Sequence, residues 1–245
     1  MRVFVEIGLN HLGSPKIAIN LLKKCIKMNI DGITLQIQPE NYYDNSKNFR
    51  KKLNLKTYME FARILKKRKK LFGLAIVDQD TLEKFKFLKP DFIKILSLSF
   101  NNKKLINAAF KSVRELFVST GVANFTSIKK MSKKYGKINF IHTTLDDQPK
   151  TANTLAIKKI QEKVKNKVSF GLHSSNINVL YGAIALQPES IFFYIKPDKL
   201  ANYPDNKHAV PIIELPNVLK TIKIVEQSLG DGSKAKKEIP DWVYE

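Results

Sequence analysis

The sequence predicts an α/β fold, a single-domain (β/α)8 TIM barrel, on the basis of three observations. Short β-rich runs alternate with amphipathic helical stretches eight times along the chain. These runs are apolar nearly throughout, as expected for parallel strands that are buried on both faces. The length of 245 residues suits eight βα units in one domain. A doubly wound open sheet is the alternative, but it would usually have fewer strands, and the sequence contains no Gly-x-Gly-x-x-Gly turn.

Each predicted strand is rich in branched and aromatic residues, whereas each predicted helix has apolar residues three and four positions apart. The strands cover residues 3–7, 32–37, 71–76, 92–96, 115–119, 138–142, 168–171 and 190–194. The helices cover residues 15–29, 55–69, 79–88, a stretch from about 102, and residues 124–134, 151–165, 176–187 and 214–229. Two long connections, 37–54 and 196–213, are candidates for functional loops. We expect the barrel to span residues 1–230 and a C-terminal tail to span residues 231–245.

The composition limits the classes of partner. The chain has 43 Lys and Arg against 22 Asp and Glu, a formal net charge of +21. Most cations lie on predicted helices, so we interpret them as solvated faces spread around the molecule and do not expect nucleic acid as a main partner. The single cysteine, Cys25, excludes internal disulfides. No leader peptide and no apolar stretch near the roughly 20 residues of a membrane span are evident, so we expect a cytoplasmic protein.

Histidines gather where the predicted strands end. His142 ends a strand, and His11, His173 and His208 follow one. In a (β/α) barrel this end of the strands carries the chemistry, so we expect the four side chains to converge on one site. Each histidine taken alone is more often a capping or hydrogen-bonded structural residue.

Two charged residues, Glu6 and Lys94, interrupt apolar strands, where a buried charge is costly unless it is paired or functional. A structural pair and a pair poised for anion binding or proton transfer both remain open. The segment Ser119-Thr120-Gly121 follows the fifth strand. Its hydroxyls and amides can bind phosphate or carboxylate, although this segment is also an ordinary helix cap.

These residues belong to an ordered series that resembles the motifs of the sialic acid synthase family. The opening segment, EIGLNHLGS at residues 6–14, is similar to the family's first motif. Further segments that resemble family motifs are residues 31–36, 94–97 with 101–102, 118–121, 142–144, 170–174, 204–208 and 229–232. The resemblance covers about 230 residues in order and implies the barrel of that family.

The resemblance implies an enzyme that condenses phosphoenolpyruvate with an amino-sugar aldehyde to a 2-keto sugar acid and releases phosphate. It implies catalytic roles for Glu6, His11 and His142. The substrate-binding residues that it implies are Asn10, Gln36, Lys94, Ser97, Ser119, Thr120 and His208. It also makes His173 a ligand of a divalent metal, Mn²⁺ or Mg²⁺, that polarises the aldehyde. The implied partners are these two small substrates, with a homodimer as one option.

The sequence departs from the family pattern at several site positions. Tyr194 replaces one of the two metal-binding histidines, which should weaken a divalent site, and Phe192 replaces a substrate-binding carboxylate. The other departures are Thr34 for a lysine, Ala75 for a threonine, Leu145 for an asparagine, Gly171 for a serine and Leu172 for an aspartate. The family's C-terminal antifreeze-like domain has no counterpart in the sequence. Three hypotheses therefore stand: a synthase-like enzyme, a barrel enzyme with other aldol-type chemistry, and an inactive relative that acts as a binding or regulatory protein.

Overall fold

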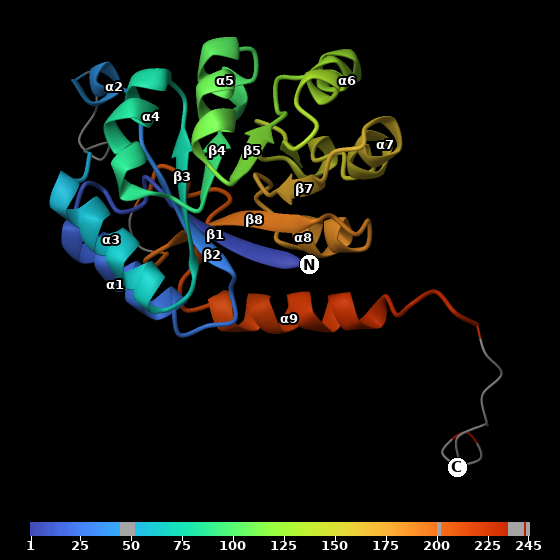
Figure 1. Ribbon diagram of the computed structural model, residues 1–245. Helices are drawn as coiled ribbons and strands as arrows, with labels where there is room; N and C mark the ends of the chain where they lie inside the picture. The colour runs from blue at the N-terminus through green and yellow to red at the C-terminus, as the bar shows by residue number, and fades with distance from the viewer. Residues whose placement is uncertain (45–51, 200–201, 235–242, 244–245) are drawn as a thin grey trace.

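Eight parallel strands close into a barrel in the computed structural model, which describes residues 1–44, 52–199, 202–234 and 243 (Figure 1). Each strand pairs with the next, and β1 pairs with β8 to close the ring. The strands are β1 (Arg2–Gly8), β2 (Gly32–Gln36), β3 (Leu71–Ile76), β4 (Phe92–Ile95), β5 (Glu115–Ser119), β6 (Asn139–His142), β7 (Val168–Gly171) and β8 (Ser190–Lys196). A short ninth strand, β9 (Val210–Pro211), pairs with β8. The predicted (β/α)8 barrel is confirmed.

Helices connect the strands and surround the barrel (Figure 1). They are α1 (Pro15–Cys25), α2 (Glu40–Asp44), α3 (Leu55–Lys67), α4 (Gln79–Phe85), α5 (Lys103–Ser112), α6 (Phe125–Lys134), α7 (Ala156–Lys163), α8 (Asn178–Ile184) and α9 (Leu215–Ser228). Among the described residues, no helix is both long and apolar enough to cross a membrane. Most of the predicted tail, residues 235–242 with 244–245, lies outside the described part of the chain.

Short polar side chains begin five of the helices. Ser14, Asn54, Asp78, Asn102 and Asn124 each accept a hydrogen bond from the backbone N–H three residues later. Such a bond satisfies one of the free amides of the first helical turn, and losing it typically costs about 1 kcal/mol. Local sequence therefore fixes where these helices start, directly after the loops at the C-terminal ends of the strands.

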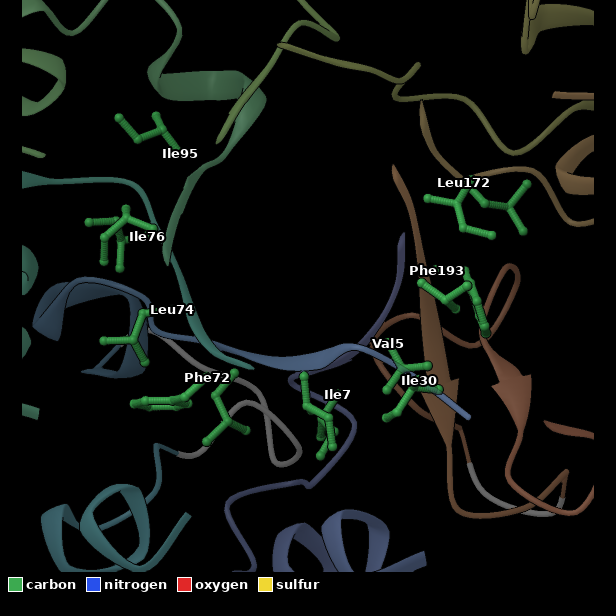
Figure 2. Packing of buried hydrophobic residues seen from close by; sticks show 14 of the residues in the cluster. Val5, Ile7, Ile30, Phe72, Leu74, Ile76, Ile95, Leu172 and Phe193 are labelled. Carbon is green, nitrogen blue, oxygen red and sulfur yellow. The ribbon is translucent and has the colours of Figure 1, made fainter. Parts of the chain in front are cut away.

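The main hydrophobic core lies between the strands and the helices. Figure 2 shows side chains such as Val5, Ile7, Leu74 and Phe193 on the outer side of the ring of strands. These positions alternate along each strand with residues that face the barrel interior, because successive side chains of a strand point to opposite faces. The alternation decides which polar residues can reach the interior.

An aromatic layer fills the barrel interior. Phe4, Phe92, Phe117 and Phe192 are fully buried and pack against one another, with the Phe4 and Phe192 rings stacked at 4.7 Å. Gly73 makes room for this layer, because a Cβ atom there would lie 2.2 Å from the Phe92 ring. The interior is therefore a packed core. A polar site at the C-terminal end of the barrel must lie between this layer and the ends of the strands.

Five of the cationic side chains line one groove at the N-terminal end of the barrel. A groove of about 660 Å³ runs between α3 and the turn before β4. Its cationic lining residues are Arg63, Lys66, Lys69, Lys70 and Lys89. The groove also contacts Leu71 and Phe72 at the start of β3, so it lies at the N-terminal end of the barrel. The expectation that nucleic acid is not a partner stays a prediction.

Candidate functional site

A cavity of about 580 Å³ opens at the C-terminal ends of the strands. It collects residues from segments far apart in the sequence. The polar residues that line it are Gln36, Gln38, Asn41, Tyr42, Ser97, Ser119, His173, Tyr194, Asp205 and His208, and the apolar ones are Pro39, Val77, Leu96, Leu98 and Leu145. Five of these fifteen residues, namely Gln36, Ser97, Ser119, His173 and His208, are site residues predicted from the sequence, and Tyr194 and Leu145 are two of the departures from the family pattern.

A buried ion pair lies next to this cavity, inside the barrel. Lys94 Nζ on β4 lies 2.5 Å from Glu6 Oε1 on β1, and both side chains are at most 3% exposed. The Thr34 hydroxyl donates to the other carboxylate oxygen of Glu6 at 3.2 Å. The ammonium group also lies 5.3 Å from the centre of the Phe192 ring and 5.6 Å from that of Tyr194. The pair therefore lies between the aromatic layer and the side chains that line the cavity.

The rings of His173, Tyr194 and His208 form one wall of the cavity, which we call the ring wall. The ring centres of His173 and His208 lie 4.9 Å apart, and the Tyr194 ring lies 5.7 Å from His173 and 5.0 Å from His208. Burial lowers the pKa of His173 to about 3, helped by His208 and Lys94, and burial lowers that of His208 to about 4. Both imidazoles are therefore neutral at neutral pH and can each offer one donor and one acceptor.

Asp205 is the carboxyl group of the cavity. Burial, together with the charge of Glu6, raises its pKa to about 7. Its Oδ2 atom is buried and has no hydrogen-bond partner in the described part of the chain. Gly8 lets Asp205 and Tyr194 approach, because a Cβ atom there would lie 2.5 Å from Asp205 Oδ2 and 2.7 Å from Tyr194 Cε1. A carboxyl group that titrates near neutrality can both give and take a proton.

Two serines, Ser97 and Ser119, form the serine side of the cavity. The Ser97 hydroxyl accepts a hydrogen bond from the N–H of Gly121 at 3.1 Å. The Ser119 hydroxyl is buried and has no hydrogen-bond partner among the described residues, so it can bind a ligand atom. The Thr120 hydroxyl instead donates to the carbonyl oxygen of Ile141. Of this segment, Ser119 is thus the residue best placed to contact an anion.

Asn10 lies beside the cavity and not on its surface. Its Nδ2 atom donates to the carbonyl oxygen of Ile195 at 2.8 Å, and its Oδ1 atom accepts from the N–H of Asp205 at 3.0 Å. Both ends of the amide group are therefore used by backbone. We interpret Asn10 as a residue that positions Asp205, rather than as a direct contact of a ligand.

His11 and His142 do not line the cavity. His11 is fully buried, and its Nδ1 atom accepts from the N–H of Gly13 at 2.9 Å. His142 Nε2 lies 3.0 Å from the carbonyl oxygen of Ala152. On β6 it shares the outer face with Phe140, because the two positions are two residues apart. The expected convergence of the four histidines is thus found for His173 and His208, and we leave the other two out of the proposed site.

A divalent metal fits these residues poorly. Burial and the charges of Glu6 and Asp205 raise the pKa of Tyr194 well above its ordinary value, so the phenol at the expected second ligand position is neutral. A neutral phenol is a weak ligand for hard divalent cations, which prefer charged oxygen atoms. Within residues 1–44, 52–199 and 202–234, no group of three or more His, Cys, Asp or Glu side chains could hold a metal ion.

Asp205 is a residue of the cavity that the sequence did not predict as a site residue, although the segment 204–208 resembles a family motif. Its signal in the sequence was the position of this motif in the long connection after the eighth strand, three residues before His208. The sequence also did not predict three further lining residues, Gln38, Asn41 and Tyr42. They lie in the connection 37–54, where no periodic pattern indicates which side chains face inward.

Comparison with known proteins identifies the family. The NeuB family model matches residues 22–234. An N,N'-diacetyllegionaminic acid synthase of Campylobacter jejuni is 23% identical over 261 residues, which cover 95% of this chain and 78% of that protein. An N-acetylneuraminate-9-phosphate synthase of Mus musculus is 22% identical over 258 residues, which cover 95% of this chain and 72% of that protein.

A solved structure supports the same assignment of the fold. The N-acetylneuraminic acid synthetase of Leptospira borgpetersenii superposes with a TM-score of 0.86 at 21% identity, covering 96% of this chain and 87% of that chain. The resemblance inferred from the motifs is thus confirmed. Because the family model spans most of the sequence, the chain belongs to the NeuB family.

Proposed function

We propose that this chain condenses phosphoenolpyruvate with an amino-sugar aldehyde to give a 2-keto sugar acid and phosphate. The observation that carries the proposal is the cavity of about 580 Å³ at the C-terminal end of the barrel. It brings Ser119, His173 and Asp205 together beside the buried Glu6–Lys94 pair. The names of the relatives, which are synthases of legionaminic acid and of N-acetylneuraminate 9-phosphate, agree with a substrate of this class.

In this proposal the serine side of the cavity binds phosphoenolpyruvate. The Ser119 hydroxyl and the Ser97 hydroxyl, whose oxygen already accepts from the N–H of Gly121, supply donors for its carboxylate or phosphate. The ammonium end of the Glu6–Lys94 pair lies within the barrel, where a low dielectric strengthens its effect on an anion and the Glu6 carboxylate offsets part of its charge. The family's substrate-binding carboxylate at position 192 is a phenylalanine in the aromatic layer, so negative charge near the anion is reduced.

The sugar aldehyde would lie against the ring wall. His173 and His208 are neutral and can hydrogen-bond its hydroxyl groups, while Gln36 and Gln38 offer amides to an acylamino group. Asp205, with a pKa of about 7, would exchange protons with the reacting oxygen atoms. These roles account for the polar groups of the cavity without the use of His11 or His142.

Phosphate release from phosphoenolpyruvate tests the proposal. The purified chain is incubated with a panel of N-acylated amino-sugar aldehydes, with and without Mn²⁺ or Mg²⁺, and both phosphate and 2-keto acid are measured. We expect phosphate and 2-keto acid to form in equal amounts with at least one sugar. Ser119→Ala should raise KM for phosphoenolpyruvate, because it removes one hydrogen bond to an anion, whereas Ser228→Ala on α9 serves as the matched control. Absence of both products with every sugar would contradict the proposal.

A binding protein without catalysis is the second candidate, and the aromatic layer favours it. Phe192 stacks on Phe4, so a carboxylate position of the family is now part of the hydrophobic core. In that case phosphoenolpyruvate or an amino sugar would raise the melting temperature, and no phosphate would be released. A shift in melting temperature that is lost in Ser119→Ala, together with absent turnover, would select this candidate.

A further inference from the structure

Tyr194 occupies a special position in the ring wall. It lies on β8 two residues after Phe192, and it is only 4% exposed. Its hydroxyl donates to Gln36 Oε1 at 3.5 Å, the outer limit of a hydrogen bond, and both residues line the cavity. The phenol is therefore held by packing rather than by a strong hydrogen bond, and its proton can be offered to a ligand.

The packing around Tyr194 is specific. Gly8, with φ of +57°, leaves the space into which the tyrosine ring edge fits. The two histidine rings flank it within 6 Å, and the ammonium group of Lys94 lies 5.6 Å from the ring centre. A tyrosine in this place is thus accommodated by its surroundings, and its ring lies where a second metal-binding side chain would be expected.

We propose that this barrel binds its substrates without a resident divalent cation, and that the Tyr194 hydroxyl polarises the substrate carbonyl by a hydrogen bond. The second half of the proposal, the role of the Tyr194 hydroxyl, rests on the proposed function. The first half, the absence of a resident cation, is argued from the donor atoms alone. The donor set supports it, since a neutral phenol, two imidazoles and one carboxyl group do not form a three-ligand group among the described residues. The Lys94 ammonium group lies 5.6 Å from the Tyr194 ring centre, but Glu6 offsets its charge, so the tyrosine hydroxyl is the group that acts on the carbonyl.

The reaction balances with these groups. Carbon 3 of phosphoenolpyruvate forms a bond to the aldehyde carbon, and the aldehyde oxygen takes the Tyr194 proton. Water then adds to carbon 2, and one of its protons returns to the tyrosine oxygen. The bond between carbon 2 and the phosphate oxygen breaks, and phosphate leaves with the proton of the newly added hydroxyl. No oxidant or reductant is required.

Metal binding to the purified chain tests the first half without any assay of activity. Mn²⁺ and Zn²⁺ are titrated calorimetrically into the native chain, Tyr194→Phe and Tyr194→His, and the metal content after purification is measured by mass spectrometry. We expect no stoichiometric metal in the native chain or in Tyr194→Phe. Tyr194→His, which places a third imidazole beside His173 and His208, should gain a site of one ion per chain. Stoichiometric metal in the native chain that is lost in His173→Ala would overturn the proposal.

The second half is tested by kinetics once a sugar substrate is known. Tyr194→Phe should lower kcat by about 100-fold or more with little change in KM for phosphoenolpyruvate, because the hydrogen bond acts on the reacting carbonyl. EDTA should leave the rate of the native chain unchanged. A full rate for Tyr194→Phe would exclude the hydroxyl, and a rate abolished by EDTA and restored by Mn²⁺ would overturn the metal-independent site. If no sugar reacts, the proposed function fails, whereas the metal titration still decides the first half.

Discussion

The side chain of Asn10 holds the backbone of Asp205 in place, across 195 residues of sequence. Its other end binds the carbonyl oxygen of Ile195, so one amide group connects the loop after β1 with the end of β8 and the loop beyond it. The acidic group of the cavity is thus positioned by the first loop of the barrel.

Replacing Asn10 by alanine should destabilise the fold by about 1–3 kcal/mol, because the N–H of Asp205 and the carbonyl of Ile195 would lose their partner. Urea unfolding measures this change. Asn217→Ala, at an exposed position of α9, is the matched control and should stay within about 0.5 kcal/mol of the native chain. Equal effects of the two substitutions would show that the Asn10 amide contributes nothing.

Breaking the Glu6–Lys94 pair should be more costly than removing it. Lys94→Met leaves a buried carboxylate unpaired and should cost about 3–5 kcal/mol. The double variant Glu6→Leu with Lys94→Met should recover much of this loss, since no buried charge then remains. Unfolding curves for both single variants and the double variant give the coupling energy. Additive losses would mean that the two groups do not depend on each other for stability.

Two glycines should respond to alanine in opposite directions. Gly8→Ala combines a positive φ with a Cβ atom 2.5 Å from Asp205 Oδ2, so it should cost about 2 kcal/mol or more. Gly182→Ala, in α8, meets nothing within 4 Å and should stabilise the fold by about 0.5–1 kcal/mol. Thermal unfolding of both variants checks the signs, and a neutral Gly8→Ala would show that the loop can open away from Asp205.

Stability should fall as the pH drops below about 6.5. Burial lowers the pKa of all four histidines in the folded chain, to about 4 in His11 and about 3 in His173, for example. The unfolded chain then binds protons that the folded chain does not. Asp205 acts in the opposite direction: its pKa of about 7 lies above the ordinary 3.8, so its contribution favours the folded state at acid pH and is lost as the pH rises toward 7.

Asp205→Asn separates these two effects. The variant should be more stable than the native chain at about pH 8, because no buried carboxylate remains, and its stability should fall more steeply between about pH 6.5 and 4. Urea unfolding at a series of pH values measures both slopes. Parallel curves for the two proteins would show that Asp205 titrates normally.

The order and position of the strands could be predicted from the sequence because each strand is a compact apolar run between polar loops. Helix ends were less predictable. The helix expected over residues 151–165 begins only at Ala156, because a short 3-10 turn and the positive φ of Asn153 interrupt its start. The short elements α2 and β9 were not expected, since five and two residues carry no periodic signal.

The candidate site was predictable where strand alternation was obeyed. Glu6 follows Phe4 by two positions and Lys94 follows Phe92 by two, so both charged side chains reach the interior with their phenylalanines. The same rule, applied to Phe140, would have placed His142 on the outer face. Asp205 could not be placed, because a loop has no such period and its position depends on a hydrogen bond to Asn10.

The aromatic layer restricts which mutations this chain can accept at its strand-eight position. The Phe192 ring stacks on Phe4 and packs edge-on against Phe92, whose ring fills the space left by Gly73, so a lone Phe192→Glu would bury an acid among these rings. An acid at position 192 would therefore need several compensating changes in the surrounding rings at once. Each further ring packed into this layer raises the number of substitutions that would have to occur together before a charged side chain could be accepted there.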